Sequence, residues 1–136
     1  MKKLRNLHII IAEDDFDDSE VILDSFQMHP LFQKVEIVRN GKELLDYLND
    51  AEKPYPDLIL TDLNMPIVNG LEVLKEICHN PEFKKIPTFA YSTSSSAIYQ
   101  TKCMDFGAKA FLTKPTEIEE FQQIPQKIIQ VMLQNL

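Results

Sequence analysis

Residues 58–66 read "LILTDLNMP", an apolar run that changes to polar residues within one position. Such a short apolar run is typical of a strand that is buried on both faces of a sheet. Asp62 follows the run directly, Asn64 comes two positions later, and Pro66 closes the stretch. All three residue types favour turns, so a solvated turn explains the stretch when it is taken alone. A functional site requires that other polar side chains converge on the same point of the fold.

Short apolar runs alternate with amphipathic segments along the chain. Five runs predict strands, at residues 7–12, 34–38, 57–61, 86–91 and 109–113. After each run, apolar residues recur at helical spacing, in residues 17–30, 41–50, 70–80, 94–107 and from 116 onward. Strands that each precede a helix predict an α/β fold with a parallel sheet covered on both faces. A barrel would need eight such units, so five units favour a doubly wound sheet.

Several residues mark where the predicted helices begin and end. Asp17 with Glu20, and Thr116 with Glu119, have the spacing of a capping box, which predicts helix starts at Asp17 and Thr116. Gly107 is expected just past the end of the fourth helix, where a left-handed residue is common. Because proline breaks the hydrogen-bond ladder, we expect a kink or a split of the last helix near residue 125.

Composition narrows the class of protein. The 136 residues, 44% hydrophobic and 26% charged, fit one domain over residues 1–136. The net charge of −7 and the lack of a basic stripe argue against a nucleic-acid partner and favour a cation or a basic protein. No stretch approaches the roughly 18 apolar residues of a membrane span, and the first apolar run is too short for a signal peptide. We therefore expect a cytoplasmic protein with Cys78 and Cys103 as reduced thiols.

Polar residues follow four of the five predicted strands, and the carboxyl ends of the strands are where sites form in open α/β sheets. The residues are Glu13, Asp14 and Asp15 after the first strand, Asp62 and Asn64 after the third, Ser92, Thr93 and Ser94 after the fourth, and Lys114 after the fifth. Carboxylates within about 4 Å repel one another by a few kcal/mol, so such a cluster needs a cation. Oxygen ligands suit Mg²⁺. With the lysine opposite, the pattern predicts a phosphoryl group carried on, or beside, Asp62.

Each of these residues also has a purely structural interpretation. The acidic run "EDDFDD" (13–18) is typical of a solvated helix entry, serines often cap helices, and a lysine before proline is usually a surface residue. The functional interpretation depends on all of them falling at the same end of one sheet.

At these residues the sequence resembles the receiver domains of two-component response regulators. The motifs that carry the resemblance are "IIIAEDD" (9–15), "DLILTDLNMPIVNGLEVL" (57–74), "IPTFAYSTSSS" (86–96) and "GAKAFLTKPT" (107–116). They span nearly the whole chain in the order and spacing of the family. The resemblance implies a flavodoxin-like doubly wound (βα)5 sandwich whose five-stranded parallel sheet has the order 2-1-3-4-5.

The resemblance assigns a metal site to the acidic residues. Asp62 matches the phospho-acceptor aspartate. Asp14 matches the carboxylate that binds Mg²⁺ directly, and Glu13 matches the one that acts through water. Asn64 matches the residue whose backbone carbonyl is the third protein ligand.

The resemblance also assigns the switch. Ser92 matches the hydroxyl that bonds the phosphoryl group, Lys114 matches the lysine that pairs with it, and Phe111 matches the aromatic residue whose rotamer follows activation. The implied protein is not an enzyme but a stand-alone response regulator. Its phosphodonor is a sensor histidine kinase or a phosphotransfer protein, and its signal passes to an unknown output protein. A homodimer is also possible, through the face formed by the fourth helix, the fifth strand and the last helix.

Three features depart from the family pattern. Asn69 stands where an Asp is common, and Thr93 is bulkier than the small residue often found after the serine. The loop "NPEFKK" (80–85) is longer than in chemotaxis-type members and resembles stand-alone receivers, some of which pair with phytochrome-type kinases.

Two other classes of protein compete with the receiver. A Mg²⁺-dependent phosphatase with an aspartyl nucleophile would carry a DxD motif after its first strand. Here the acceptor is on the third strand, and Asn64 stands where the second Asp of that motif would be. A flavodoxin-like FMN binder needs a Ser/Thr/Gly-rich phosphate loop after the first strand, where "EDD" (13–15) would repel phosphate. Turnover of a phosphate ester would favour the first alternative, and a coloured protein would favour the second.

Overall fold

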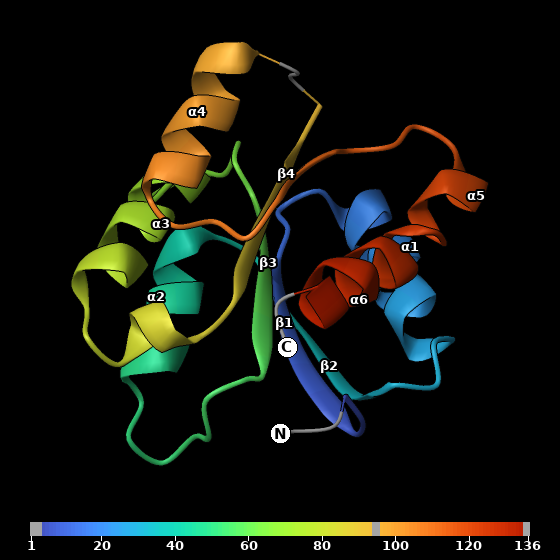
Figure 1. Cartoon of the computed structure of the whole chain (residues 1–136), viewed down its shortest axis with the longest axis horizontal. Coiled ribbons are helices and arrows are strands. Elements are labelled where there is room, and N and C mark those ends of the chain that lie inside the picture. The colour runs from blue at the N-terminus through green and yellow to red at the C-terminus, as the bar shows by residue number, and fades with distance from the viewer. Residues whose placement is uncertain (1–3, 94–95, 135–136) are drawn as a thin grey trace.

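The computed structural model describes residues 4–93 and 96–134. Within them, five parallel strands form one sheet with the order β2-β1-β3-β4-β5, which confirms the predicted flavodoxin-like fold (Figure 1). The strands are β1 (Leu7–Ala12), β2 (Phe32–Val38), β3 (Leu58–Asp62), β4 (Thr88–Ser92) and β5 (Phe111–Thr113). β2 is longer than predicted and β5 shorter, and β3 includes Asp62 itself.

Helices cover both faces of the sheet (Figure 1). They are α1 (Phe16–Gln27), α2 (Gly41–Asn49), α3 (Gly70–His79), the 3₁₀ helix η1 (Phe83–Lys85), α4 (Ala97–Asp105), α5 (Ile118–Phe121) and α6 (Ile124–Gln134). In Figure 1, α2, α3 and α4 lie on one side of the sheet, and α1, α5 and α6 on the other. None of the helices in the described part of the chain combines the length and the hydrophobicity that a membrane span requires.

Alternation along the central strand divides the core between the two faces. Ile9 and Ile11 of β1 are fully buried in a cluster with α1 and α6, which contribute Phe26 and Ile128. Ile10, between them, is equally buried in the opposite cluster with α2 and α3. Burying such a side chain stabilises the fold by about 1.5–3 kcal/mol. Because β1 is apolar on both faces, it packs in the centre of the fold. Polar residues can therefore stand only near its ends.

Both predicted capping boxes are wrong by one or two residues. Asp15 is the N-cap of α1, because its Oδ1 accepts a hydrogen bond from the backbone N–H of Asp18 at 2.8 Å. The helix therefore begins before Asp17. At the other end of the chain, the backbone of Glu117 is still extended (φ −103°, ψ 143°), so α5 begins at Ile118, one residue later than a cap at Thr116 would allow.

The predictions at residues 107 and 125 are confirmed. Gly107 has φ +85°, and the N–H groups of Gly107 and Ala108 donate to the carbonyls of Met104 and Cys103, which is a Schellman motif at the end of α4. The last helix is split into α5 and α6, and Pro125 is the second residue of α6, where a missing N–H breaks no intrahelical bond. The predicted start of α4 at residues 94 and 95 lies outside the described residues.

The loop between β3 and α3 contains an unusual backbone conformation. Ile67 has φ +70°, and the N–H of Val68 donates to the carbonyl of Pro66 at 2.8 Å, which closes a γ-turn around Ile67. A β-branched residue rarely adopts positive φ. The Ile67 side chain is 73% exposed, so no packing against the core accounts for this conformation.

Candidate functional site

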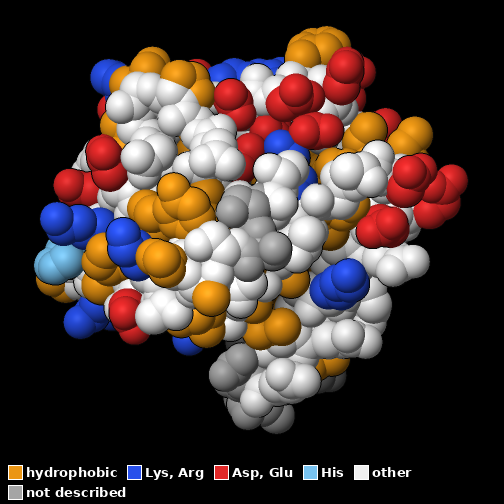
Figure 2. Space-filling model, turned by 90° about the horizontal axis from the view of Figure 1, so that it is seen from above, with side chains coloured by type: hydrophobic (Ala, Val, Ile, Leu, Met, Phe, Trp, Pro, Cys, Tyr) orange, Lys and Arg blue, Asp and Glu red, His pale blue; other side chains and the backbone are white. Residues whose placement is uncertain are grey.

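The carboxyl ends of the strands bring the predicted polar residues together. Glu13 follows β1, Asp62 ends β3, Ser92 ends β4, and Lys114 follows β5. All four side chains are buried, although all four are polar. Viewed onto this end of the molecule, acidic side chains gather around basic atoms (Figure 2).

Lys114 is the centre of the cluster. Its Nζ lies 2.7 Å from Oε1 of Glu13, 2.9 Å from Oδ2 of Asp18 and 3.1 Å from Oδ2 of Asp62. An ammonium has three N–H donors, so these three carboxylates account for all of them. The ion pairs join the ends of β1, β3 and β5 to the first turn of α1.

Glu13 is held by contacts to both of its oxygens. Oε1 accepts hydrogen bonds from Lys114 and from the Tyr91 hydroxyl, and Oε2 accepts one from the backbone N–H of Asp15 at 3.1 Å. Removal from water raises the pKa of Glu13, and the bonds from Lys114 and Tyr91 oppose that rise. Since both oxygens are engaged within the protein, Glu13 is better placed to act on a metal indirectly than as a direct ligand.

The same contacts fix the protonation of the two partners of Glu13. Burial by itself lowers the pKa of Lys114, but the bonds to Glu13 and Asp18 and the charge of Asp62 outweigh burial and raise it. Burial, together with the charge of Glu13, raises the pKa of Tyr91. Lys114 therefore stays charged at neutral pH, and Tyr91 stays a hydrogen-bond donor.

The Asp62 carboxylate is oriented from two sides. Its Oδ1 accepts from the backbone N–H of Asn64 at 3.1 Å, and its Oδ2 accepts from Lys114. The main chain behind it is close to α3, because a Cβ added to Gly70 would lie 2.3 Å from the Asp62 carbonyl oxygen. The side chain is only 5% exposed, so it reaches solvent over a small part of its surface.

Three carboxylates at this site are close enough to hold a metal ion. One oxygen each from Glu13, Asp14 and Asp62 lies within 4.8 Å of the others, and Asp14 is exposed while the other two are buried. An all-oxygen donor set of this charge fits a hard divalent cation. The predicted contribution of the Asn64 carbonyl stays a prediction.

The two predicted switch residues occupy different environments. Ser92 is 1% exposed, and its carbonyl accepts from the backbone N–H of Lys114 at 2.8 Å, which joins β4 to the end of β5. Phe111 is half-buried and packs against the cluster between the sheet and the helices α3 and α4 that contains Leu74 and Cys103. Phe111 therefore lies on the face of the sheet that α3 and α4 cover.

Sequence reasoning missed two members of the site, Asp18 and Tyr91. Asp18 belongs to the acidic run, but only the cap at Asp15 determines which carboxylate of that run faces the sheet. Tyr91 sits in the fully buried strand β4, where its position suggests only core packing, yet its hydroxyl reaches the end of β1. No short-range pattern indicates either contact.

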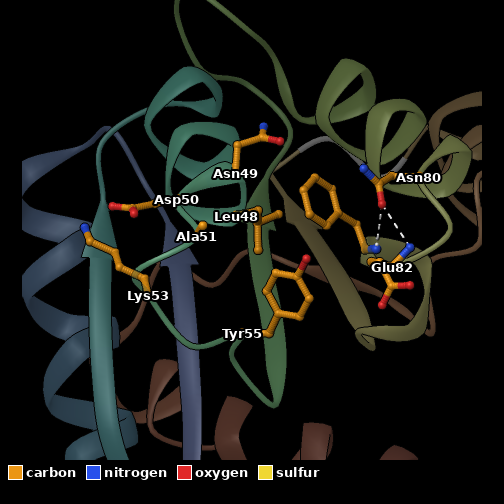
Figure 3. Close-up of a pocket in the computed structure, with 9 residues that line it drawn as sticks. Leu48, Asn49, Asp50, Ala51, Lys53, Tyr55, Asn80 and Glu82 are labelled. Atoms are coloured by element: carbon orange, nitrogen blue, oxygen red, sulfur yellow. Dashed lines mark hydrogen bonds between the residues drawn. The ribbon is translucent and has the colours of Figure 1, made fainter.

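A second hollow lies near the start of β3, at the end of the sheet opposite to Asp62 (Figure 3). The rings of Tyr55 and Phe83 meet there edge to face, with centroids 5.8 Å apart. The side-chain oxygen of Asn80 accepts from the backbone N–H groups of Glu82 and Phe83, at 2.9 and 3.0 Å. These contacts fix η1 against the end of α3, so they have a structural role in the longer loop.

Comparison with known families agrees with this geometry. A family model described as the response regulator receiver domain matches residues 9–126. Response regulator Rcp1 of Synechocystis sp. is 28% identical over 132 residues, which cover 94% of this chain and 90% of that protein.

Two solved structures are similar over most of their length. The phosphorylated cyanobacterial phytochrome response regulator RcpA superimposes with a TM-score of 0.87 and 31% identity, covering 96% of each chain. The Mn²⁺-bound form of response regulator Rcp1 gives a TM-score of 0.83 and 28% identity, covering 90% of this chain and 91% of that one.

Proposed function

The chain belongs to the response regulator receiver domain family, and from that premise we propose that it is a stand-alone phosphorylation switch. Asp62 accepts the phosphoryl group from a phosphohistidine of a sensor kinase or phosphotransfer protein. The observation that carries the proposal is the convergence of a buried Asp62 with a charged Lys114 beside the carboxylates of Glu13 and Asp14.

In the proposed reaction, a carboxylate oxygen of Asp62 is the nucleophile. It forms a bond to phosphorus while the phosphorus–nitrogen bond of phosphohistidine breaks, and the imidazole leaves with the electron pair and takes up a proton. The Asn64 N–H fixes the carboxylate from one side. Lys114 stabilises the negative charge of the transferred group, as positioned cations do in phosphoryl transfer.

The metal in this proposal is Mg²⁺, which Asp14, Asp62 and the Asn64 carbonyl would hold directly and Glu13 would contact through water. When bound, it neutralises charge on the phosphoryl oxygens. The all-oxygen cluster supports this assignment, as does the Mn²⁺-bound form of the similar Rcp1. The three carboxylates carry more negative charge than the single ammonium of Lys114 neutralises, which gives the site affinity for a further cation.

The proposed output is a change on the face formed by α4, β5 and the last helix, which the structure divides into α5 and α6. A phosphoryl oxygen draws the Ser92 hydroxyl toward Asp62, and Phe111 moves into the vacated space. A hydrogen bond to a charged group contributes about 1.5–3 kcal/mol, which shifts a two-state equilibrium by one to two decades. In its changed conformation this face binds an output protein or a second copy of the chain. The overall charge of −7 favours a protein partner with a basic surface, in the cytoplasm.

Labelling with acetyl phosphate and Mg²⁺ tests the proposal. Intact mass spectrometry should show one phosphoryl group on the wild-type protein and none on Asp62→Asn. Asp46→Asn, the same change on the exposed surface of α2, serves as the control and should be labelled normally. Full labelling of Asp62→Asn would refute the assignment, and steady turnover of a phosphate ester would favour the phosphatase instead.

A further inference from the structure

Lys114 has a partner that the proposed chemistry does not require. Asp18, on the first turn of α1, places Oδ2 2.9 Å from Nζ of Lys114. Its position is fixed because its backbone N–H donates to the Asp15 cap at 2.8 Å. Its side chain is 34% exposed, whereas that of Glu13, the other carboxylate on the same Nζ, is fully buried.

The number of N–H donors on Lys114 limits how many hydrogen bonds it can donate to a phosphoryl group. Glu13, Asp18 and Asp62 use its three N–H groups, so a phosphoryl group on Asp62 can take over only the donor that now faces Asp62. The other two donors stay with Glu13 and Asp18. One ammonium charge is thus shared between a dianionic group and two carboxylates.

We infer that Asp18 is a positioning residue that acts through Lys114 and weakens the hold of the pocket on a phosphoryl group. The inference rests on the proposed role of Asp62. Asp18 Oδ2 and Asp62 Oδ2 contact the same nitrogen, at 2.9 and 3.1 Å, so they are no more than about 6 Å apart. A carboxylate at that distance repels the added phosphoryl charge and draws the ammonium toward α1.

Removing the charge of Asp18 should leave Lys114 in place. Glu13 still holds Nζ at 2.7 Å from the buried side, and asparagine keeps the shape and one acceptor oxygen of aspartate. The expected effect is therefore a gain of affinity for a phosphoryl-like group, roughly three- to tenfold for a single charge at this distance near the surface.

Beryllofluoride, with saturating Mg²⁺, is the probe, because it binds a carboxylate as a tetrahedral anion without turnover. Its dissociation constant is measured by ¹⁹F NMR on the whole protein. Asp18→Asn should bind it three- to tenfold more tightly than wild type, by the charge effect above. The matched control is Asp17→Asn, which removes the same charge from the same helical turn at an exposed position and should leave affinity unchanged.

Two further measurements separate a charge effect from structural damage. Asp18→Glu keeps the charge and should stay near the wild-type affinity. The Mg²⁺ dissociation constant of Asp18→Asn, measured without the anion, should be unchanged or higher, because a negative charge has been lost. Damage to the pocket would weaken the binding of both the metal and the anion.

The outcomes distinguish this inference from the proposed function. A wild-type protein that does not bind beryllofluoride overturns the role of Asp62 and the inference with it. If wild type binds, equal affinities for Asp18→Asn and Asp17→Asn, weaker binding by Asp18→Asn, or tightening by Asp18→Glu each overturn the inference about Asp18 alone.

Discussion

Replacing Tyr91 with phenylalanine removes one hydroxyl from the buried side of the site and leaves the ring in place. That hydroxyl donates to Oε1 of Glu13, which is fully buried. A hydrogen bond to a charged group contributes about 1.5–3 kcal/mol, so we expect Tyr91→Phe to lower the free energy of unfolding by about 2 kcal/mol at pH 8.

The loss should depend on pH with a definite sign. Burial raises the pKa of Glu13 above its ordinary value of 4.5, and the Tyr91 bond counteracts part of that rise. Between 4.5 and the raised pKa the folded protein binds more protons than the unfolded chain, so stability falls as pH rises through this window. Without the hydroxyl the folded-state pKa is higher still, and stability falls over a wider window. The difference between the two proteins should therefore be smaller near pH 5 than at pH 8.

Urea unfolding followed by circular dichroism, in the presence of a chelator, measures both effects. Tyr55→Phe is the control, since Tyr55 is 47% exposed and the change should cost little at any pH. A Tyr91→Phe protein as stable as wild type at pH 8, or a difference that does not change between pH 5 and pH 8, would contradict the role assigned to this hydroxyl.

Three other changes give separate tests. Ile67→Gly should raise the free energy of unfolding by up to about 1 kcal/mol in urea titrations, because left-handed backbone is costly for isoleucine. A variant less stable than the wild type would show that the turn at Ile67 is not strained. Gly70→Ala should reduce acetyl phosphate labelling of a folded protein, because the new Cβ would lie 2.3 Å from the Asp62 carbonyl oxygen; normal labelling would argue against that contact. Mg²⁺ at 100 times its dissociation constant should stabilise the wild type by about 2.7 kcal/mol in the same titrations. Asp14→Asn should lose most of this gain, and an equal gain would exclude Asp14 as a ligand.

The parts of the site that sequence predicts are those attached directly to strand ends. The strands that lead to these residues are short and mostly apolar, and parallel strands finish at the same edge of the sheet, so the residues that follow them must meet. Glu13, Asp62 and Lys114 were predictable for this reason. The position of each residue in the sequence also identifies the strand that it follows.

The parts that could not be predicted depend on side-chain direction over long separations. Tyr91 lies 78 residues from Glu13, and only the packed sheet brings its hydroxyl to that carboxylate. Asp18 faces Lys114 because the N-cap of α1 is Asp15, two residues earlier than the apparent capping box at Asp17. A shift of one helical position turns a side chain by about 100°, so an error in the helix start changes which acid enters the site.

The contacts of Lys114 also bear on how the chain reaches its folded state. β1 pairs with β2 and β3, so the carboxylates of Glu13 and Asp62 approach each other from sequence made early in synthesis. Lys114 lies 52 residues after the Asp62 that it contacts. Until β5 docks, repulsion between these acids opposes closure of the partly formed sheet. Addition of the last strand therefore couples strand pairing to charge neutralisation, and we expect it to be a late, cooperative step.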